Sequence, residues 1–428
     1  MLPVISDLQP IPDDVRAENC RMIGLASSFV TFSETEKARA AAWKARTETL
    51  PPAAKQAAPY IGKDGRPGTA QYDFCLPAEF AEYTLLPEIR SDALELFAEL
   101  GIPWHASVHG GPSNHLVSSQ VQCVNALARM VTDPSRLVAA FGPTLGTAEV
   151  LEIEPGRHLT FEYIGPEDFF GEATHGARIR GAHCTSVDAA FVHRTDDGLV
   201  ELVLVEWKYT ESYRLRTPDP ARDRARMGRY ADAVADPDGP VRGDLLATEL
   251  LFDEPFYQLT RQQLLAHALE RTGAEDAQRV RVVHVLSPAN DAYQQSLARP
   301  EHRALGETVS VAWQQLLRAK DRFVSMHPDV FLDPTVTSPE YASRYGERQL
   351  HNDQDVLDEF GVPDLTSLED VIDFEGEIFT STHGLELLVG NVGTVIEYPF
   401  TQDDLRRLSD EVETEYTEAI ERADTEED

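Results

Sequence analysis

Two stretches decide the fold of this chain: Thr185-Ser186-Val187-Asp188-Ala189 and, after a short turn, Leu202-Val203-Leu204-Val205-Glu206-Trp207-Lys208. The second is an almost unbroken apolar run, which is typical of a central strand buried on both faces. Side chains alternate along a strand, so Glu206 and Lys208 share one face and Trp207 points away. Charged groups at the end of a buried strand are costly unless something pairs them. A divalent metal held by Asp188 and Glu206, beside Lys208, would supply that pairing.

The sequence between these stretches predicts a hairpin. Asp188 and Glu206 are 18 residues apart, and the turn falls at Thr195-Asp196-Asp197-Gly198, where Asp-Gly is a strong turn signal. An Asp followed by a Glu-x-Lys also arises by chance, and an exposed Glu/Lys pair is usually a solvated edge. The chain, however, has six lysines against 32 arginines. A lysine two residues after Glu206, at the end of an apolar strand, therefore favours a functional reading.

This arrangement resembles the PD-(D/E)xK nuclease superfamily, whose fold is restriction-endonuclease-like. The resemblance implies that Asp188 and Glu206 hold Mg²⁺, with Mn²⁺ as a substitute, and that Lys208 orients and polarises the attacking water. Val187 stands where the motif's name has Pro, a position that the superfamily holds loosely.

Other stretches resemble a particular group of uncharacterised restriction endonucleases in that superfamily, which implies fold and metal chemistry but no substrate. They lie between about residues 70 and 325: Tyr72-Asp73-Phe74-Cys75-Leu76-Pro77, Ile102-Pro103-Trp104-His105, Ser118-Ser119-Gln120, Glu206-Trp207-Lys208-Tyr209-Thr210-Glu211 and Tyr257-Gln258-Leu259-Thr260-Arg261.

The order of predicted elements indicates an α/β (α+β) fold, a mixed sheet with helices on both faces. We expect a nuclease core at 105–330, an N-terminal helical and loop extension at 1–104, and an acidic C-terminal extension at 331–428. The predicted strands are His158–Ile164, Thr185–His193, Val200–Lys208 and Arg279–Leu286. The predicted helices are Glu34–Leu50, Leu86–Leu100, Ser118–Met130, Pro220–Val234, Phe256–Arg271 and Val311–Val324. The C-terminal extension is predicted to hold a hairpin, Leu385–Val389 with Gly393–Tyr398, and then a helix capped by Thr401.

Three polar residues on predicted helices are candidates for supporting the site or contacting substrate. Gln120 lies on a helix that packs under the active site in the superfamily, and bridging of buried backbone is an equal alternative. Gln258 and Arg261 share a helix face. In related nucleases a polar residue after the lysine strand faces the active site, and simple bridging between helix and strand is the alternative.

The predicted helix at 220–234 carries Arg222, Arg224, Arg226 and Arg229, four arginines within eight residues of an acidic chain. They are the best candidates for contacts to DNA phosphates. An ordinary solvated helix with ion pairs from Asp219 and Asp223 is equally compatible with the pattern.

The net charge of −35 is unusual for a protein that binds nucleic acid. Abundant acidic residues with arginine in place of lysine indicate a halophilic protein, in which molar salt screens repulsion within about 3 Å. The charge is also uneven, because residues 351–428 hold 24 acidic and 3 basic side chains. This region is either a solvating extension or a segment that docks near residues 222–229 and competes with phosphates.

We therefore expect a Mg²⁺-dependent DNA endonuclease or exonuclease (a hydrolase of phosphodiester bonds) that acts in restriction-like defence or repair. A non-catalytic module that binds nucleic acid or protein, and a nuclease that acts on RNA, remain alternatives. No helix-turn-helix or zinc-finger pattern is recognisable, so targeting is left to a homodimer or a separate subunit. The start of the sequence lacks a signal-peptide pattern and no apolar run is long enough to span a bilayer, so we expect a cytoplasmic protein without membrane contacts.

Overall fold

The computed structural model describes residues 31–346 except 174–177, 183 and 214–218, three strands between 377 and 397, and single helical residues at 407 and 414. The chain divides into two compact units, of which one is Thr31–Glu347. The predicted boundaries at 104 and 330 both fall inside this unit. Trp43 and Phe97, which precede the boundary at 104, and Tyr341, which follows the boundary at 330, belong to one hydrophobic core with Val203 of the central strand.

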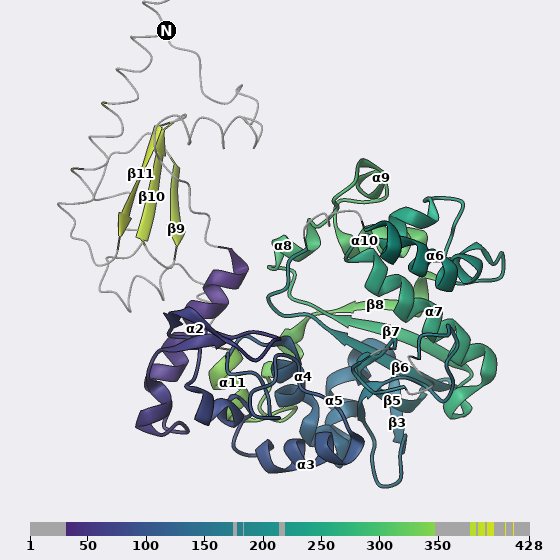
Figure 1. The fold of residues 1–428 in the computed structure, drawn as a ribbon, viewed down its shortest axis with the longest axis horizontal. Coiled ribbons are helices and arrows are strands. Elements are labelled where there is room, and N and C mark those ends of the chain that lie inside the picture. The colour runs from purple at the N-terminus through teal and green to yellow at the C-terminus, as the bar shows by residue number, and fades with distance from the viewer. Residues whose placement is uncertain are drawn as a thin grey trace, which may run out of the picture. The chain divides into compact units, whose positions relative to one another are not determined.

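A mixed six-stranded sheet forms the middle of this unit (Figure 1). Its path runs β3-β5-β6-β7-β8, and β4 pairs with β5 outside that path. The β3, β4 and β6 pairings with β5 are antiparallel, whereas β6, β7 and β8 run parallel to one another. The strands are β3 (Thr147–Leu151), β4 (Thr160–Tyr163), β5 (Val187–Thr195), β6 (Val200–Trp207), β7 (Arg279–Val285) and β8 (Phe323–Met326), with a separate antiparallel pair of β1 (Ala58–Ile61) and β2 (Pro67–Tyr72).

Helices cover both faces of the sheet, as predicted (Figure 1). Alternate residues of β6 enter different cores: Val203, Val205 and Trp207 pack with α3, α4, α5 and α11, whereas Leu202 and Leu204 pack with α6, α7 and α10. The helices are α2 (Phe32–Arg46), α3 (Arg90–Leu100), α4 (Ser119–Leu127), α5 (Pro134–Leu145), α6 (Pro220–Ala235), α7 (Phe256–Thr272), α8 (Asp291–Gln294), α9 (Pro300–Arg303), α10 (Val309–Leu316) and α11 (Pro339–Tyr345).

Side-chain caps fix the ends of the helices that surround the site. Ser118 accepts a hydrogen bond from the backbone of Val121 and so begins α4. Asp219 accepts two backbone hydrogen bonds at the start of α6. Gly273 ends α7 in the left-handed conformation that glycine adopts at low cost.

Two parts of the predicted element order are corrected. The predicted helix Val311–Val324 ends at Leu316, because Phe323 and Val324 begin β8 and pair with β7. Short apolar runs such as Phe323-Val324 do not distinguish a helix end from a buried strand. Helix α5 and strand β3 are not predicted, because Gly142-Pro143 is a typical turn signal, yet α5 continues through Pro143.

The C-terminal unit contains an antiparallel sheet in the order β11-β10-β9: β9 (Glu377–Ser381), β10 (Gly384–Val389) and β11 (Val392–Glu397). The predicted hairpin is confirmed, with Val389 opposite Val392, and β9 is an addition to it. The predicted helix after Thr401 lies outside the described residues, apart from the helical residues Arg407 and Thr414.

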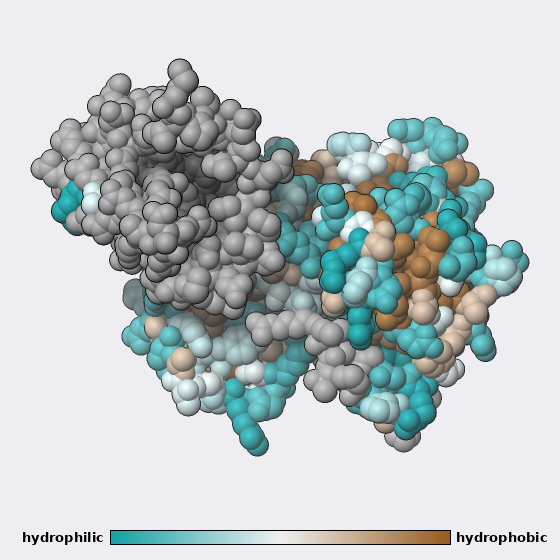
Figure 2. Space-filling view, turned by 90° about the horizontal axis from the view of Figure 1, so that it is seen from above, coloured by the Kyte–Doolittle hydropathy of each residue, from teal (hydrophilic) through white to brown (hydrophobic). Residues whose placement is uncertain are grey.

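Hydrophilic residues cover much of the exposed surface of the unit Thr31–Glu347, as its charge leads one to expect (Figure 2). Hydrophobic residues show between them on the part that carries α6 and α10 (Figure 2). In the described part of the chain, no helix is both long and apolar enough to cross a membrane.

Candidate functional site

The hairpin of β5 and β6 places Asp188 and Glu206 side by side. Ala189 pairs with Val205, so the same antiparallel register puts Asp188 opposite Glu206 on the face that α7 covers. The Asp188 carboxylate accepts a hydrogen bond from the backbone N–H of Trp207 at 2.6 Å. The Trp207 ring lies on the other face, where its Nε1 donates to Gln122 of α4. The backbone thus holds one carboxylate while the indole anchors the strand end.

Lys208 and Glu206 form a buried ion pair, with Nζ 2.6 Å from Oε1 of Glu206. Gln258 of α7 bridges the pair, because its Nε2 donates to Glu206 at 2.7 Å and its Oε1 accepts from Lys208 at 2.9 Å. One turn later in α7, Nε2 of Gln262 donates to the second carboxylate oxygen of Glu206. Both oxygens of Glu206 are therefore held by side chains of a single helix.

Glu162 of β4 is a third carboxylate in this cluster, and its role could not be predicted from the sequence. Its φ of 48° is rare for a residue other than glycine. Phe161 and Tyr163 pair with β5, but Glu162 between them does not. Its carboxylate accepts hydrogen bonds from Ser186 at 2.9 Å and Gln120 at 3.2 Å. In sequence Glu162 is an ordinary polar residue between two aromatic strand residues, and no local signal marks the left-handed backbone.

The carboxylates perturb one another electrostatically. Burial, with the charges of Glu206 and Glu162, raises the pKa of Asp188 well above its ordinary value. Burial also raises the pKa of Glu162 to about 7, and Glu206 adds to the effect although hydrogen bonds from Ser186 and Gln120 oppose it. Burial lowers the pKa of Lys208, but Glu206 together with Tyr213 and Glu211 outweighs burial, so the pKa of Lys208 is raised well above its ordinary value. Three carboxylates thus lie within electrostatic reach of one ammonium, which forms its ion pair with Glu206.

Within this cluster, the carboxylates of Asp188 and Glu206 suit a divalent cation. The excess of buried negative charge would be compensated by two positive charges, and carboxylate oxygens are the ligands that Mg²⁺ prefers. Within the described residues, no group of three or more His, Cys, Asp or Glu side chains is arranged to hold a metal ion. Mg²⁺ usually binds through one or two carboxylates and takes its other ligands from water and phosphate. Asp188 and Glu206 suit that mode.

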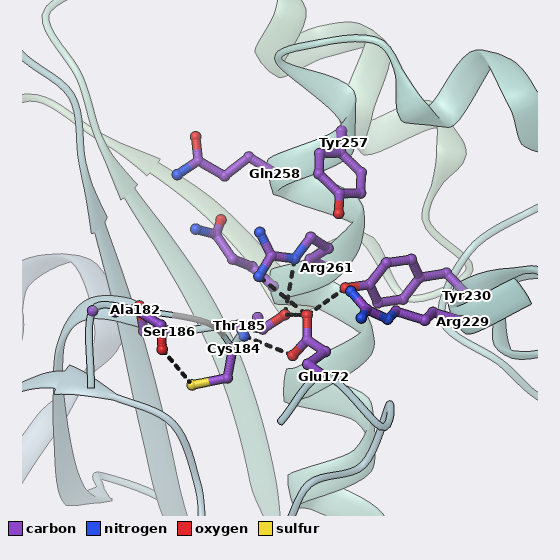
Figure 3. Close-up of a pocket in the computed structure, with 12 residues that line it drawn as sticks. Glu172, Ala182, Cys184, Thr185, Ser186, Arg229, Tyr230, Tyr257, Gln258 and Arg261 are labelled. Atoms are coloured by element: carbon purple, nitrogen blue, oxygen red, sulfur yellow. Dashed lines mark hydrogen bonds and ion pairs between the residues drawn. The ribbon is translucent and has the colours of Figure 1, made fainter. Parts of the chain in front are cut away.

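The three supporting residues that we predicted lie at or beside the cluster. Gln258 contacts Glu206 and Lys208, and Gln120 contacts Glu162. Arg261 lies beside the cluster, where its Nε donates a hydrogen bond to Thr185 at 2.9 Å and its Nη2 donates to Glu172 at 3.1 Å. It borders a polar pocket of about 430 Å³ that also includes Gln258, Gln262 and Ser186 (Figure 3).

The four arginines of α6 do not form one surface. Arg222, Arg224 and Arg229 are exposed, and Arg229 also lines the polar pocket. Arg226 is buried, which corrects its prediction as a phosphate contact. Its guanidinium lies 3.6 Å from the centre of the Tyr257 ring and donates to the backbone oxygen of Phe252. Packing of α6 against α7 turns this one position inward.

Comparison with known proteins gives one family. The model of the family described as "restriction endonuclease associating with ARP" matches residues 36–346, more than half of the chain. No curated protein and no solved structure matches the chain. The matched range includes the whole six-stranded sheet and every residue of the carboxylate cluster.

Proposed function

This chain belongs to the family of restriction endonucleases associating with ARP, and we propose that it is a metal-dependent nuclease that hydrolyses phosphodiester bonds in DNA. The observation that carries the proposal is the buried ion pair of Glu206 and Lys208, with Asp188 opposite Glu206 on β5 and Glu162 electrostatically coupled to both carboxylates. Such a concentration of buried carboxylates is unfavourable for stability alone, and it is typical of a site that holds a cation.

Asp188 and Glu206 would hold Mg²⁺, together with the backbone carbonyl of Trp207, and Mn²⁺ would substitute. When bound, the ion would lower the pKa of a water and offset negative charge on the phosphate. Within the protein, Oε1 of Gln258 accepts a hydrogen bond of 2.9 Å from the ammonium of Lys208 and so holds it beside Glu206. Lys208 is thereby positioned to orient the attacking water and to stabilise charge that develops on the phosphoryl oxygens.

Glu162 supports the same site from β4. Its two oxygens accept from Ser186 and Gln120, so its position is fixed by α4 and by the segment before β5. In the proposed mechanism it contributes negative charge that strengthens cation binding. Gln120 therefore acts on the site by positioning Glu162.

The direct test is hydrolysis by the purified full chain. Linear duplex, circular duplex and single-stranded DNA, and RNA, would each be incubated with Mg²⁺ or Mn²⁺ at low salt and at molar salt. We expect metal-dependent cleavage of DNA that persists at molar salt, and none with the Asp188→Asn variant. Cleavage that survives EDTA and this substitution would contradict the proposal.

A binding module without catalysis is the second candidate. It would bind DNA without cleaving it under any of these conditions. Cleavage of RNA alone would favour a ribonuclease. We also propose a cytoplasmic location. Targeting is proposed to come from a second copy of the chain or from another subunit, and light scattering of the purified chain tests whether it forms a dimer.

A further inference from the structure

The polar pocket borders the carboxylate cluster, and the side chains between the two contact both. Ser186, Gln258 and Gln262 line the pocket. The same three side chains donate to Glu162 or Glu206. A ligand in the pocket would therefore lie one side chain away from the proposed scissile phosphate.

At one wall of the pocket, hydrogen bonds within the protein already satisfy the carboxylate of Glu172, so this group does not need a ligand. The buried carboxylate of Glu172 accepts from the N–H of Thr185 at 2.6 Å, from its hydroxyl at 2.8 Å, and from Tyr230. Arg261 donates to both Glu172 and Thr185. Figure 3 shows Arg261, Tyr230 and Thr185 converging on Glu172. The network fixes the guanidinium of Arg261 at the pocket wall.

The remaining lining groups suit an anion that also carries a hydrogen-bond donor. Arg229 of α6 is exposed and lines the pocket opposite α7, which supplies Arg261 (Figure 3). Gln262 is only 1% exposed, and its Oε1 has no hydrogen-bond partner in the described part of the chain. A buried amide oxygen without a donor is unfavourable, so a ligand N–H or O–H would satisfy it.

The size of the pocket selects among such ligands. A volume of about 430 Å³ lies among pockets that enclose small organic molecules, roughly 300–1,000 Å³. One phosphate group would leave most of it empty, whereas a phosphate with its sugar and base would occupy it.

We propose that this pocket is a nucleotide subsite. It receives the nucleotide next to the scissile phosphate, unstacked from its strand, with a phosphate toward Arg229 and Arg261 and a donor of the base or sugar toward Gln262. The proposal rests on the proposed nuclease function and specifies its substrate. Because a base must be unpaired from a duplex but not from a single strand, single-stranded DNA and frayed ends are the preferred substrates.

The test measures binding without cleavage. Calorimetry with the full chain in EDTA would compare deoxynucleoside monophosphates with deoxynucleosides and with inorganic phosphate. We expect the monophosphates to bind at least tenfold more tightly than either fragment. Equal affinity for inorganic phosphate would reduce the pocket to a general anion site and overturn the proposal.

Matched variants locate the binding. Arg229→Glu is expected to weaken monophosphate binding at least tenfold, whereas Arg66→Glu, an equal charge change at an exposed position that does not line the pocket, leaves it within about twofold. Gln262→Met removes the amide oxygen that is proposed to accept a hydrogen bond from the base or sugar. Thermal unfolding verifies that each variant is folded. Equal weakening by Arg229→Glu and Arg66→Glu would show an effect of charge alone and contradict the subsite.

The two proposals fail separately. Monophosphate binding in a protein that cleaves nothing would refute the nuclease while the pocket remains a nucleotide site. Cleavage of duplex DNA at the same rate as single strands, with no monophosphate binding, would refute the subsite and leave the nuclease standing.

Discussion

Gly181 lies directly against the carboxylate of Glu162: a Cβ at residue 181 would be 3.1 Å from Cδ of Glu162. Gly181 has a φ of +71°. The Gly181→Ala substitution therefore both strains the backbone and displaces Glu162. We expect it to reduce metal-dependent cleavage at least tenfold, measured at limiting Mg²⁺.

Gly156 provides the matched control. Its φ is +73°, but a Cβ there would meet no atom within 4 Å. Both alanine variants should lose about 1–2 kcal/mol of stability from the left-handed backbone, measured by urea unfolding. Only Gly181→Ala should lose activity, and equal activity loss in both would show that strain rather than Glu162 is responsible.

Replacing Asp188 by Asn should separate stability from function. Because like charges and burial raise the pKa of Asp188, the neutral amide should stabilise the metal-free protein by about 1–3 kcal/mol. Asn retains an oxygen that accepts from the backbone of Trp207. Thermal unfolding in EDTA should show a higher midpoint, and added Mg²⁺ should raise it less than in the wild type. An unchanged response to Mg²⁺ would remove Asp188 from the metal site.

Lys208→Met should greatly reduce cleavage while Mg²⁺ still binds. In the proposed mechanism the ammonium acts on the water and on the phosphate rather than on the ion, so the rate should fall by roughly 10²–10⁴-fold. Removing one partner of the buried pair with Glu206 should also cost about 3–5 kcal/mol in EDTA. Single-turnover kinetics and calorimetry measure the two effects, and full activity would refute the role of Lys208.

Substitution of the buried arginine of α6 should affect folding stability, whereas substitution of an exposed one should affect DNA binding. Arg226→Ala removes the contact with Tyr257 and the hydrogen bond to Phe252, so we expect a loss of folding stability. Arg224→Ala should leave stability unchanged and reduce the salt dependence of DNA binding by about one unit of slope. Urea unfolding and binding titrations at several salt concentrations distinguish them.

His284 should make the protein sensitive to acid. It is fully buried on β7, in register with Glu206, and burial lowers its pKa to about 3 from an ordinary value of 6.5. Between these values the unfolded chain binds a proton that the folded chain does not. Stability is therefore complete above pH 6.5 and falls on acidification, by up to about 1.4 kcal/mol per pH unit. His284→Leu should flatten this fall between pH 6.5 and 4.5 in EDTA, and an identical slope would contradict the assignment.

The strands that carry the acidic pair could be predicted from sequence because burial on both faces leaves an unmistakable apolar run. The expected strand Val200–Lys208 is observed as Val200–Trp207, and Asp188 is the second residue of β5. Because side chains alternate along a strand, Glu206 and Lys208 could be assigned to the same face of the sheet from the sequence alone. These are local properties of the chain.

The parts that could not be predicted depend on contacts between distant elements. The place of Glu162 in the cluster depends on an irregular backbone in β4 and on Gln120 of α4. The inward position of Arg226 depends on Tyr257 of α7. Gln262 shares a helix face with Gln258, but only the packing of α7 on β6 shows that it reaches Glu206. Helical spacing fixes which residues share a face, whereas the tertiary fold decides what that face meets.

The parallel pairing of β6 with β7 has a consequence for how the protein folds. The hairpin of β5 and β6 closes over a short turn, whereas β7 joins only after a crossover from Trp207 to Arg279 that contains α6 and α7. Long-range parallel contacts form slowly because chain entropy is lost before they are made. During synthesis Asp188, Glu206 and Lys208 therefore emerge well before α7 can deliver Gln258 and Gln262. We expect the cluster of Asp188, Glu206 and Lys208 to be completed only after α7 has formed, so that a nascent chain carries the acidic pair before the helix that holds it in place.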